Sequence, residues 1–186
     1  MRAEIDYELV NKSIEFMKRQ QAAGKPFFLY LPFSMGHVPN LPAKEFAGKS
    51  RIGNYGDKIM EGDYHVGQIL DALKDLGVED NTTLSLPLTT VRAAKFSAST
   101  VTRAHRIWAT EAPFRGELGE ATEGSIRTFA FIRWPGHVKS NATSYAMFSI
   151  MDFFPTDTEG ETILLAIVVK FCQRIFRAGC RTEMYL

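Results

Sequence analysis

The sequence predicts an α/β fold in which a mostly parallel β-sheet is flanked by helices. Three observations support this class. A helical pattern of apolar residues runs from about Asp6 to Ala23, a continuous apolar stretch follows at Phe27–Leu31, and a second helical pattern spans about Tyr55 to Leu76. Helices that alternate with short, wholly apolar stretches are typical of parallel sheets.

The first helix is predicted to begin at Asp6, which can cap it, and to run to about Ala23, where Gly24 stops it. Its apolar residues recur at helical spacing, and they are Leu9, Val10, Ile14 and Met17. Glycine is common just after the last turn of a helix. We therefore expect an amphipathic helix that packs on the sheet and leads into the strand at Phe27.

The stretch Phe27–Leu31 is bounded by Pro26 and Pro32 and is predicted to be a strand buried on both faces. A loop that contains His37 follows directly. In open α/β sheets, ligand sites lie just beyond the carboxyl ends of the strands. His37 therefore stands where such a protein would do chemistry, although a single loop histidine is more often structural or solvated.

The second helix is predicted to end at about Leu76, and Gly77 is the natural capping residue after its last turn. Its apolar stripe consists of Ile59, Val66, Ile69, Leu70, Leu73 and Leu76. Asp57, Glu61 and Asp63 make its first turns acidic, which suits the positive end of the helix dipole. We expect these three carboxylates to form a solvated face rather than a metal site.

The second half of the chain has weaker signals. Pro87 interrupts the apolar run that begins at Leu84, and proline is difficult to place in a central strand. The later predictions are a strand at Phe129–Arg133, a turn at 134–136, a helix capped by Asp152, and a helix or a strand at Ile163–Phe171.

Composition excludes some classes of partner. The chain has 186 residues, of which 45% are apolar and 23% charged, and its formal net charge is +1. Its basic residues are scattered, so we expect no nucleic-acid partner. Its longest apolar run, Ile163–Val169, is too short to span a bilayer, so we expect no membrane partner. No signal peptide is evident at the N-terminus. Cys172 and Cys180 match no zinc or redox pattern. Compartment and oligomeric state stay open.

Several segments resemble the sulfatase family, and they occur in that family's order. Residues 25–39 read KPFFLYLPFSMGHVP, residues 66–74 read VGQILDALK, residues 132–136 read IRWPG, and residues 151–156 read MDFFPT. The likeness covers residues 7–83 and 112–156, whereas 84–111 and 157–186 diverge. It implies that residues 1–186 form a single partial domain with the alkaline-phosphatase-like fold.

The resemblance also implies an arylsulfatase-like activity, the hydrolysis of a small-molecule sulfate ester, with His37 pointing at the ester. Intact members use calcium, held in part by an Asp-Asn-Gly segment, and a formylglycine made from the Cys or Ser of Cys/Ser-x-Pro-x-Arg. Neither sequence occurs in this chain. The family lysine falls on Leu118 and its tryptophan on Thr122. We predict no cofactor or metal ligands here.

We therefore expect an interior fragment of a sulfatase that is inactive alone. The alternative is a non-catalytic, degenerate or frameshifted gene product with at most weak anion or partner binding. Leu88–Arg92 can spell Asp-Asn-Gly-Pro in another reading frame, which is the motif that the family would have there. A sheet without its full set of strands is also expected to be only marginally stable or prone to aggregate.

Overall fold

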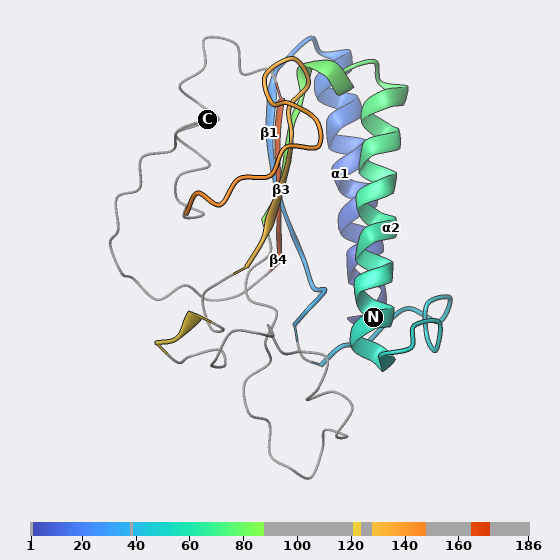
Figure 1. The fold of residues 1–186 in the computed structure, drawn as a ribbon. Helices are drawn as coiled ribbons and strands as arrows, with labels where there is room; N and C mark the ends of the chain where they lie inside the picture. Colours follow the sequence, from blue (N-terminus) through green and yellow to red (C-terminus); the bar gives the residue numbers. More distant parts are fainter. Residues whose placement is uncertain (1, 38, 88–120, 124–127, 148–164, 172–186) are drawn as a thin grey trace.

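The computed structural model describes residues 2–37, 39–87, 121–123, 128–147 and 165–171. Two long helices and four strands account for most of them (Figure 1). In chain order the elements are η1 (Arg2–Glu4), α1 (Ile5–Ala22), β1 (Phe27–Phe33), α2 (Gly53–Asp75), η2 (Glu79–Asn81), β2 (Thr83–Pro87), β3 (Ala130–Arg133) and β4 (Leu165–Phe171). The predicted α/β class is confirmed.

The four strands form one sheet in the order β1-β4-β2-β3. β4 lies parallel to both of its neighbours, with Phe27 opposite Leu165 and Thr83 opposite Ala166. β3 runs antiparallel to β2 at one edge. The sheet is therefore mostly parallel, as predicted, and the carboxyl ends of β1, β4 and β2 meet at one edge of it.

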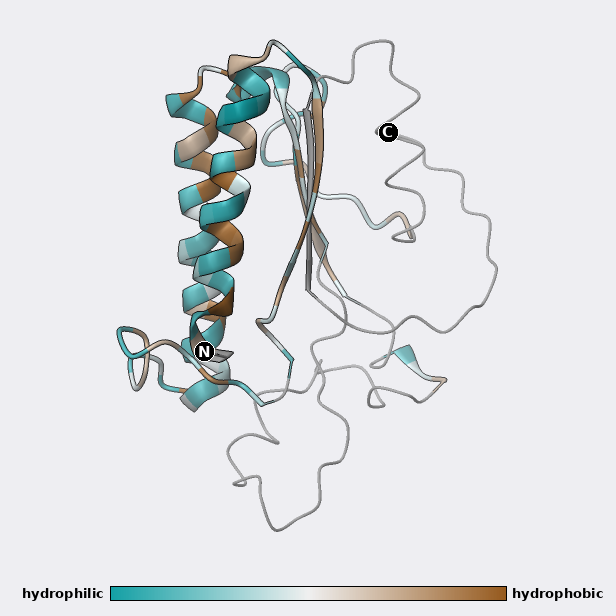
Figure 2. Cartoon of the chain, turned by 180° about the vertical axis from the view of Figure 1, so that it is seen from behind, coloured by the Kyte–Doolittle hydropathy of each residue, from teal (hydrophilic) through white to brown (hydrophobic). Residues whose placement is uncertain are grey.

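Both helices lie side by side on one face of the sheet (Figures 1 and 2). The core between the two layers is apolar, because its burial from water drives the packing. It includes Val10 and Met17 of α1, Phe27, Leu31 and Phe33 of β1, Ile69 and Leu73 of α2, and Leu84 of β2. No helix in the described ranges is long and apolar enough to cross a membrane.

Both helices end as predicted, with a glycine just past the last turn. Gly24 and Gly77 have φ angles of +63° and +67°. In each case the glycine N–H and the following N–H donate to carbonyls of the last turn, at 2.9–3.1 Å. This pair of bonds is the Schellman motif, in which the glycine takes the left-handed conformation.

The start of α1 differs from the prediction. The residue that precedes the helix is Glu4, and Asp6 lies inside the first turn with only 1% of its surface exposed. Asp6 does not cap the helix, because its carboxylate contacts Ser34, just past the end of β1, and Lys58 of α2, as described below.

β1 is longer and less buried than predicted. It continues through Pro32 to Phe33, and Phe28 and Tyr30 remain 41% and 46% exposed. In the described part of the chain, both long helices lie on the same face of the sheet, so alternate residues of β1 face away from them. β1 is also an edge strand of the described sheet, where proline is tolerated.

β2 and β4 correct the expectations for the second half. Thr83–Pro87 is a strand despite its proline. Pro87 is its last residue and pairs only with Ala130 of β3, beyond the register that β2 shares with β4. The ambiguous stretch at 163–171 contains strand β4.

The strand at Ala130–Arg133 and the turn after it are as predicted. The predictions for Leu118, Asp152, Cys172 and Cys180 lie outside the described residues.

Candidate functional site

His37 closes a tight turn at the carboxyl end of β1. Its N–H donates to the carbonyl of Ser34 at 3.3 Å, and Gly36 lies between them with φ +78°. Positive φ at the third residue of a turn favours glycine. The side chain of His37 is exposed. The structure thus puts His37 at the edge of the sheet where the sequence predicted it.

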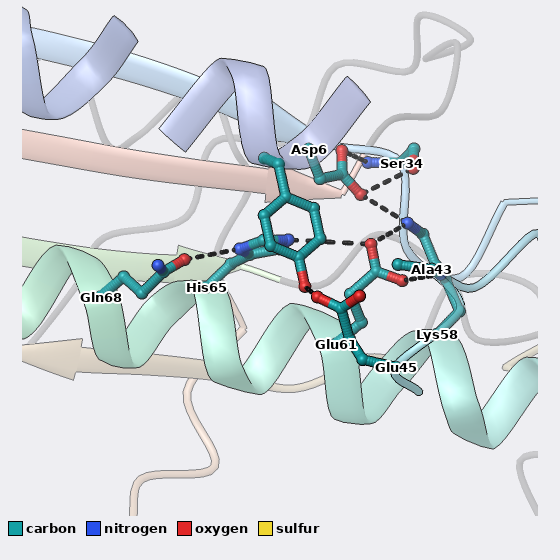
Figure 3. Close-up of polar contacts among 9 residues, drawn as sticks. Asp6, Ser34, Ala43, Glu45, Lys58, Glu61, His65 and Gln68 are labelled. Carbon is teal, nitrogen blue, oxygen red and sulfur yellow. Dashed lines mark hydrogen bonds and ion pairs between the residues drawn. The ribbon is translucent and has the colours of Figure 1, made fainter. Parts of the chain in front are cut away.

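Asp6 of α1 holds the first residue of this turn (Figure 3). Its Oδ1 accepts the backbone N–H of Ser34 at 2.9 Å, and its Oδ2 accepts the Ser34 hydroxyl at 2.7 Å. Asp6 Oδ2 also lies 3.0 Å from Nζ of Lys58. The carboxylate therefore fixes the point at which the chain leaves β1.

Glu61 of α2 holds a later point of the same loop. Its Oε2 accepts the N–H of Ala43 at 2.8 Å, and its Oε1 lies 2.6 Å from Nζ of Lys58. Glu61 is 0% exposed and Lys58 is 2% exposed. Burial acts to raise the pKa of Glu61, but His65, Lys58 and the Ala43 N–H together lower it. The ionised form is the one that this environment favours.

Asp57, one helical turn earlier, holds the loop as it approaches α2. Its two oxygens accept the N–H groups of Gly48, at 2.8 Å, and Ser50, at 2.6 Å. It is 0% exposed. Burial acts to raise its pKa, but the N–H donors of Ser50 and Gly48 outweigh burial and lower it. The predicted solvated face is therefore wrong for Asp57 and Glu61, and Asp63 alone is exposed.

Met35 adds an apolar contact to these polar ones. A side chain on Gly62 of α2 would overlap the sulfur of Met35, so the absence of a Cβ there lets Met35 lie directly on the helix. Met35 is only 5% exposed. The loop is thus seated on α2 next to His37.

His65 continues the buried polar row along α2. It is 0% exposed, its Nδ1 lies 2.9 Å from Oε1 of Gln68, and its Nε2 lies 3.7 Å from Oε1 of Glu61. The ring of Tyr7 packs on it edge-to-face at 4.4 Å. Within the described residues, Nε2 has no hydrogen-bond partner.

Tyr7 joins this cluster to the loop from the other helix. Its phenol donates a hydrogen bond to Glu45, which lies on the loop. Partial burial and the Glu45 carboxylate raise the pKa of Tyr7. The phenol therefore keeps its proton and remains a donor at neutral pH.

The sequence analysis did not predict that Lys58, Glu61 and His65 are buried, although a signal for it was present. Lys58, Glu61 and His65 follow the spacing of the buried residues Ile69 and Leu73 along the same helix. Extending that stripe toward the start of α2 puts charged side chains on the core face.

The buried cluster does not fit a calcium ion. The carboxylates of Asp6 and Glu61 are both engaged by the ammonium of Lys58, which already supplies the positive charge between them. In the described part of the chain, no group of three or more His, Cys, Asp and Glu residues could hold a metal ion. The position predicted for an Asp-Asn-Gly segment, 88–92, lies outside those residues.

Comparison with known proteins gives a consistent result. The family model named Sulfatase matches residues 3–87. N-acetylgalactosamine-6-sulfatase of Canis lupus familiaris is 33% identical over 147 residues, which are 79% of this chain and 27% of that protein. Steryl-sulfatase of Mus musculus is 32% identical over 148 residues, 80% of this chain and 23% of that protein.

A solved structure agrees with these matches. Its description concerns the metabolism of multiple glycosaminoglycans by Bacteroides thetaiotaomicron. It superposes on this chain with a TM-score of 0.63 and 31% sequence identity. The match covers 75% of this chain and 29% of the chain in that structure. The chain spans about a quarter of the length of the curated relatives that it matches. By sequence and by fold, the chain belongs to the sulfatase family.

Proposed function

We propose that this chain supplies His37 to a site that hydrolyses sulfate esters. The observation that carries the proposal is the position of His37, which is exposed at the carboxyl edge of the parallel strands on a loop fixed by buried carboxylates. That edge is where ligands bind in open α/β sheets. Membership of the sulfatase family supports the choice of ligand.

The chemistry proposed for His37 follows from its imidazole. A sulfate ester carries negative charge on its sulfuryl oxygens, and its leaving oxygen needs a proton. An imidazole can donate a hydrogen bond to the former or a proton to the latter near neutral pH. Acid–base assistance of this kind supplies only part of a typical enzymatic acceleration.

The remaining parts of the reaction need groups that this sequence does not contain. A Cys/Ser-x-Pro-x-Arg segment, the source of formylglycine, does not occur in it. We propose that calcium and formylglycine act in intact members of the family and that this chain alone turns over little or no sulfate ester. The relatives named above are an N-acetylgalactosamine-6-sulfatase and a steryl-sulfatase, so we propose sulfate esters as a class and no single substrate.

The proposal is tested by following both the ligand and the reaction. Inorganic sulfate and a non-hydrolysable aryl sulfonate are titrated into the chain while the histidine ring signals are recorded by NMR. We expect the His37 ring signal, which is identified by its absence in His37→Ala, to shift as the anion is added. His137→Ala is the matched control, because His137 is also exposed but stacks on Trp134 at 4.4 Å, away from the carboxyl edge.

A shift of equal size at both histidines would show nonspecific anion binding and would contradict the assignment of His37. Sulfate release from an aryl sulfate in the presence of calcium is measured in parallel. Release that disappears in His37→Ala would support the role of His37 and overturn the expectation that the chain is inactive alone. Binding without release would leave the role as an anion-binding residue of a non-catalytic chain.

A further inference from the structure

The loop that carries His37 is attached to both helices, and two of its attachments share one cation. Ser34, at its start, is bonded to Asp6 of α1, and Ala43 is bonded to Glu61 of α2. Each attachment uses a backbone N–H of the loop and a carboxylate with at most 1% of its surface exposed. Backbone N–H groups that bond to buried carboxylates form strong, short hydrogen bonds.

Lys58 connects the two attachments. Its Nζ lies 3.0 Å from Oδ2 of Asp6 and 2.6 Å from Oε1 of Glu61, and Figure 3 shows the ammonium between them. The other oxygen of each carboxylate accepts the loop N–H. A continuous chain of contacts therefore runs from Ser34 through Asp6, Lys58 and Glu61 to Ala43, which we call the loop clasp.

The clasp depends on its one cation. Two buried carboxylates close to each other repel, and one of them tends to take up a proton. A proton on either carboxylate would make that carboxylate a weaker acceptor for the N–H group of the loop. Lys58 offsets this repulsion, and removal of one partner from a buried ion pair leaves an uncompensated charge.

We propose that Lys58 is a positioning residue for the His37 site, acting through the loop clasp. His37 lies three residues after Ser34 and donates its N–H to the Ser34 carbonyl, so a displacement of Ser34 is passed to the turn that holds His37. The relevance to sulfate esters rests on the proposed function, whereas the coupling between the two ends of the loop does not.

A clasp that acts as a unit makes a specific prediction. Asp6 is hydrogen-bonded to the loop at Ser34, and Glu61 is hydrogen-bonded to the loop at Ala43. Asp6→Asn should nevertheless loosen Ala43, and Glu61→Gln should loosen Ser34, because Lys58 links the two ends. Two separate hydrogen bonds would give no such cross-effect.

The test is amide hydrogen exchange of the full chain, followed by NMR at Ser34 and Ala43, with Leu73 in the core of α2 as the reference. In Lys58→Met we expect both loop amides to exchange at least about tenfold faster relative to Leu73, since one broken buried pair is worth more than the ~1.4 kcal/mol that a tenfold change represents. We also expect the ring signal of His37 to shift. Lys58 is buried and His37 is exposed, so this shift would reach His37 through the loop.

Lys12→Met is the matched control. Lys12 forms an ion pair with Glu8 at 2.7 Å, but both side chains are largely exposed, at 69% and 66%. Such pairs contribute little. We expect unchanged exchange at Ser34 and Ala43 and an unchanged His37 signal.

Two results would overturn the proposal. One is Lys58→Met with both amides still protected. The other is that each of Asp6→Asn and Glu61→Gln accelerates only its own partner. If Lys58→Met does not fold, the two shape-conserving variants decide by their cross-effects. Because no sulfate ester is present in these measurements, failure of the sulfate titration at His37 would leave their outcome unaffected.

Discussion

At the scale of single residues, the surroundings of α2 decide which of its acidic side chains are buried. Asp57 and Glu61 are buried against the loop, whereas Asp63, on the same turns of the helix, is exposed. The expectation of a solvated face followed the average behaviour of carboxylates. It failed because the N–H donors that satisfy them belong to a loop whose path the sequence does not reveal.

Asp57→Asn should destabilise the chain at neutral pH. Asparagine keeps one acceptor oxygen, so one of the two loop N–H groups loses its partner, which costs about 1–3 kcal/mol. Because the pKa of Asp57 is lowered below its ordinary value of 3.8, the unfolded chain takes up the proton first on acidification. The contribution of Asp57 is therefore complete above about pH 3.8 and is lost as the pH falls through the lower folded value.

The measurement is the free energy of unfolding by urea at a series of pH values. The difference between the native chain and Asp57→Asn should be largest near pH 7 and should shrink below pH 3.8. Asp63→Asn is the control, with an expected change under about 0.5 kcal/mol because the side chain is exposed. A gap between Asp57→Asn and the native chain that stays constant down to acid pH would contradict the prediction.

At the scale of elements, the helices and β1 could be predicted because their signals are local. Apolar periodicity and a terminal glycine set the ends of α1 and α2 to within a few residues. β2 and β4 could not be predicted with the same certainty. The proline of β2 is acceptable only because it lies past the end of the register with β4, which is a property of the assembled sheet.

The candidate site shows the same division. The position of His37 followed from the order of strand and loop, and the structure agrees with it. The support beneath it did not, because Lys58 and His65 look like surface residues until the helix is packed. Conversely, the exposed face of β1 at Tyr30 was not foreseen, because an apolar run alone does not say how many faces are covered.

Gly62→Ala tests how closely the loop lies on α2. A Cβ at this position would overlap the side chain of Met35, so Met35 must move or the helix must shift. Overpacking of this kind costs about 1–3 kcal/mol, against a gain of about 0.5–1 kcal/mol from the higher helix propensity of alanine. We expect a net loss of stability and a shifted His37 ring signal.

Gly67→Ala is the matched control for this change. It lies in the interior of the same helix, and no atom lies within 4 Å of the Cβ position. Here only the propensity term applies, so thermal unfolding should occur at a higher temperature. Equal effects of the two substitutions would show that Met35 does not rest on Gly62.

At the scale of the whole molecule, the described sheet is covered by helices on one face only (Figure 1). β1 forms one edge of that sheet and carries Tyr30, which is 46% exposed. Edge strands with exposed apolar side chains promote association between chains. This arrangement supports the expectation that the chain is prone to aggregate.

Tyr30→Lys should increase the fraction of monomer, because a lysine on an edge strand opposes strand-to-strand association. Sedimentation velocity over a range of concentrations measures that fraction. Tyr145→Lys is the control, since Tyr145 is 88% exposed but lies outside the sheet, and we expect no change from it. A native chain that stays monomeric at every concentration tested would rule out this account.

The pairing of β1 with β4 has a consequence for biosynthesis. Phe27 lies opposite Leu165, so β1 gains its neighbour β4 only after the ribosome has added residues 34–164 and β4 itself. Contacts between residues so distant along the chain slow folding. During translation, α1, β1 and α2 are available early while the central place in the sheet stays empty, and a chaperone that shields nascent strands would act in that interval.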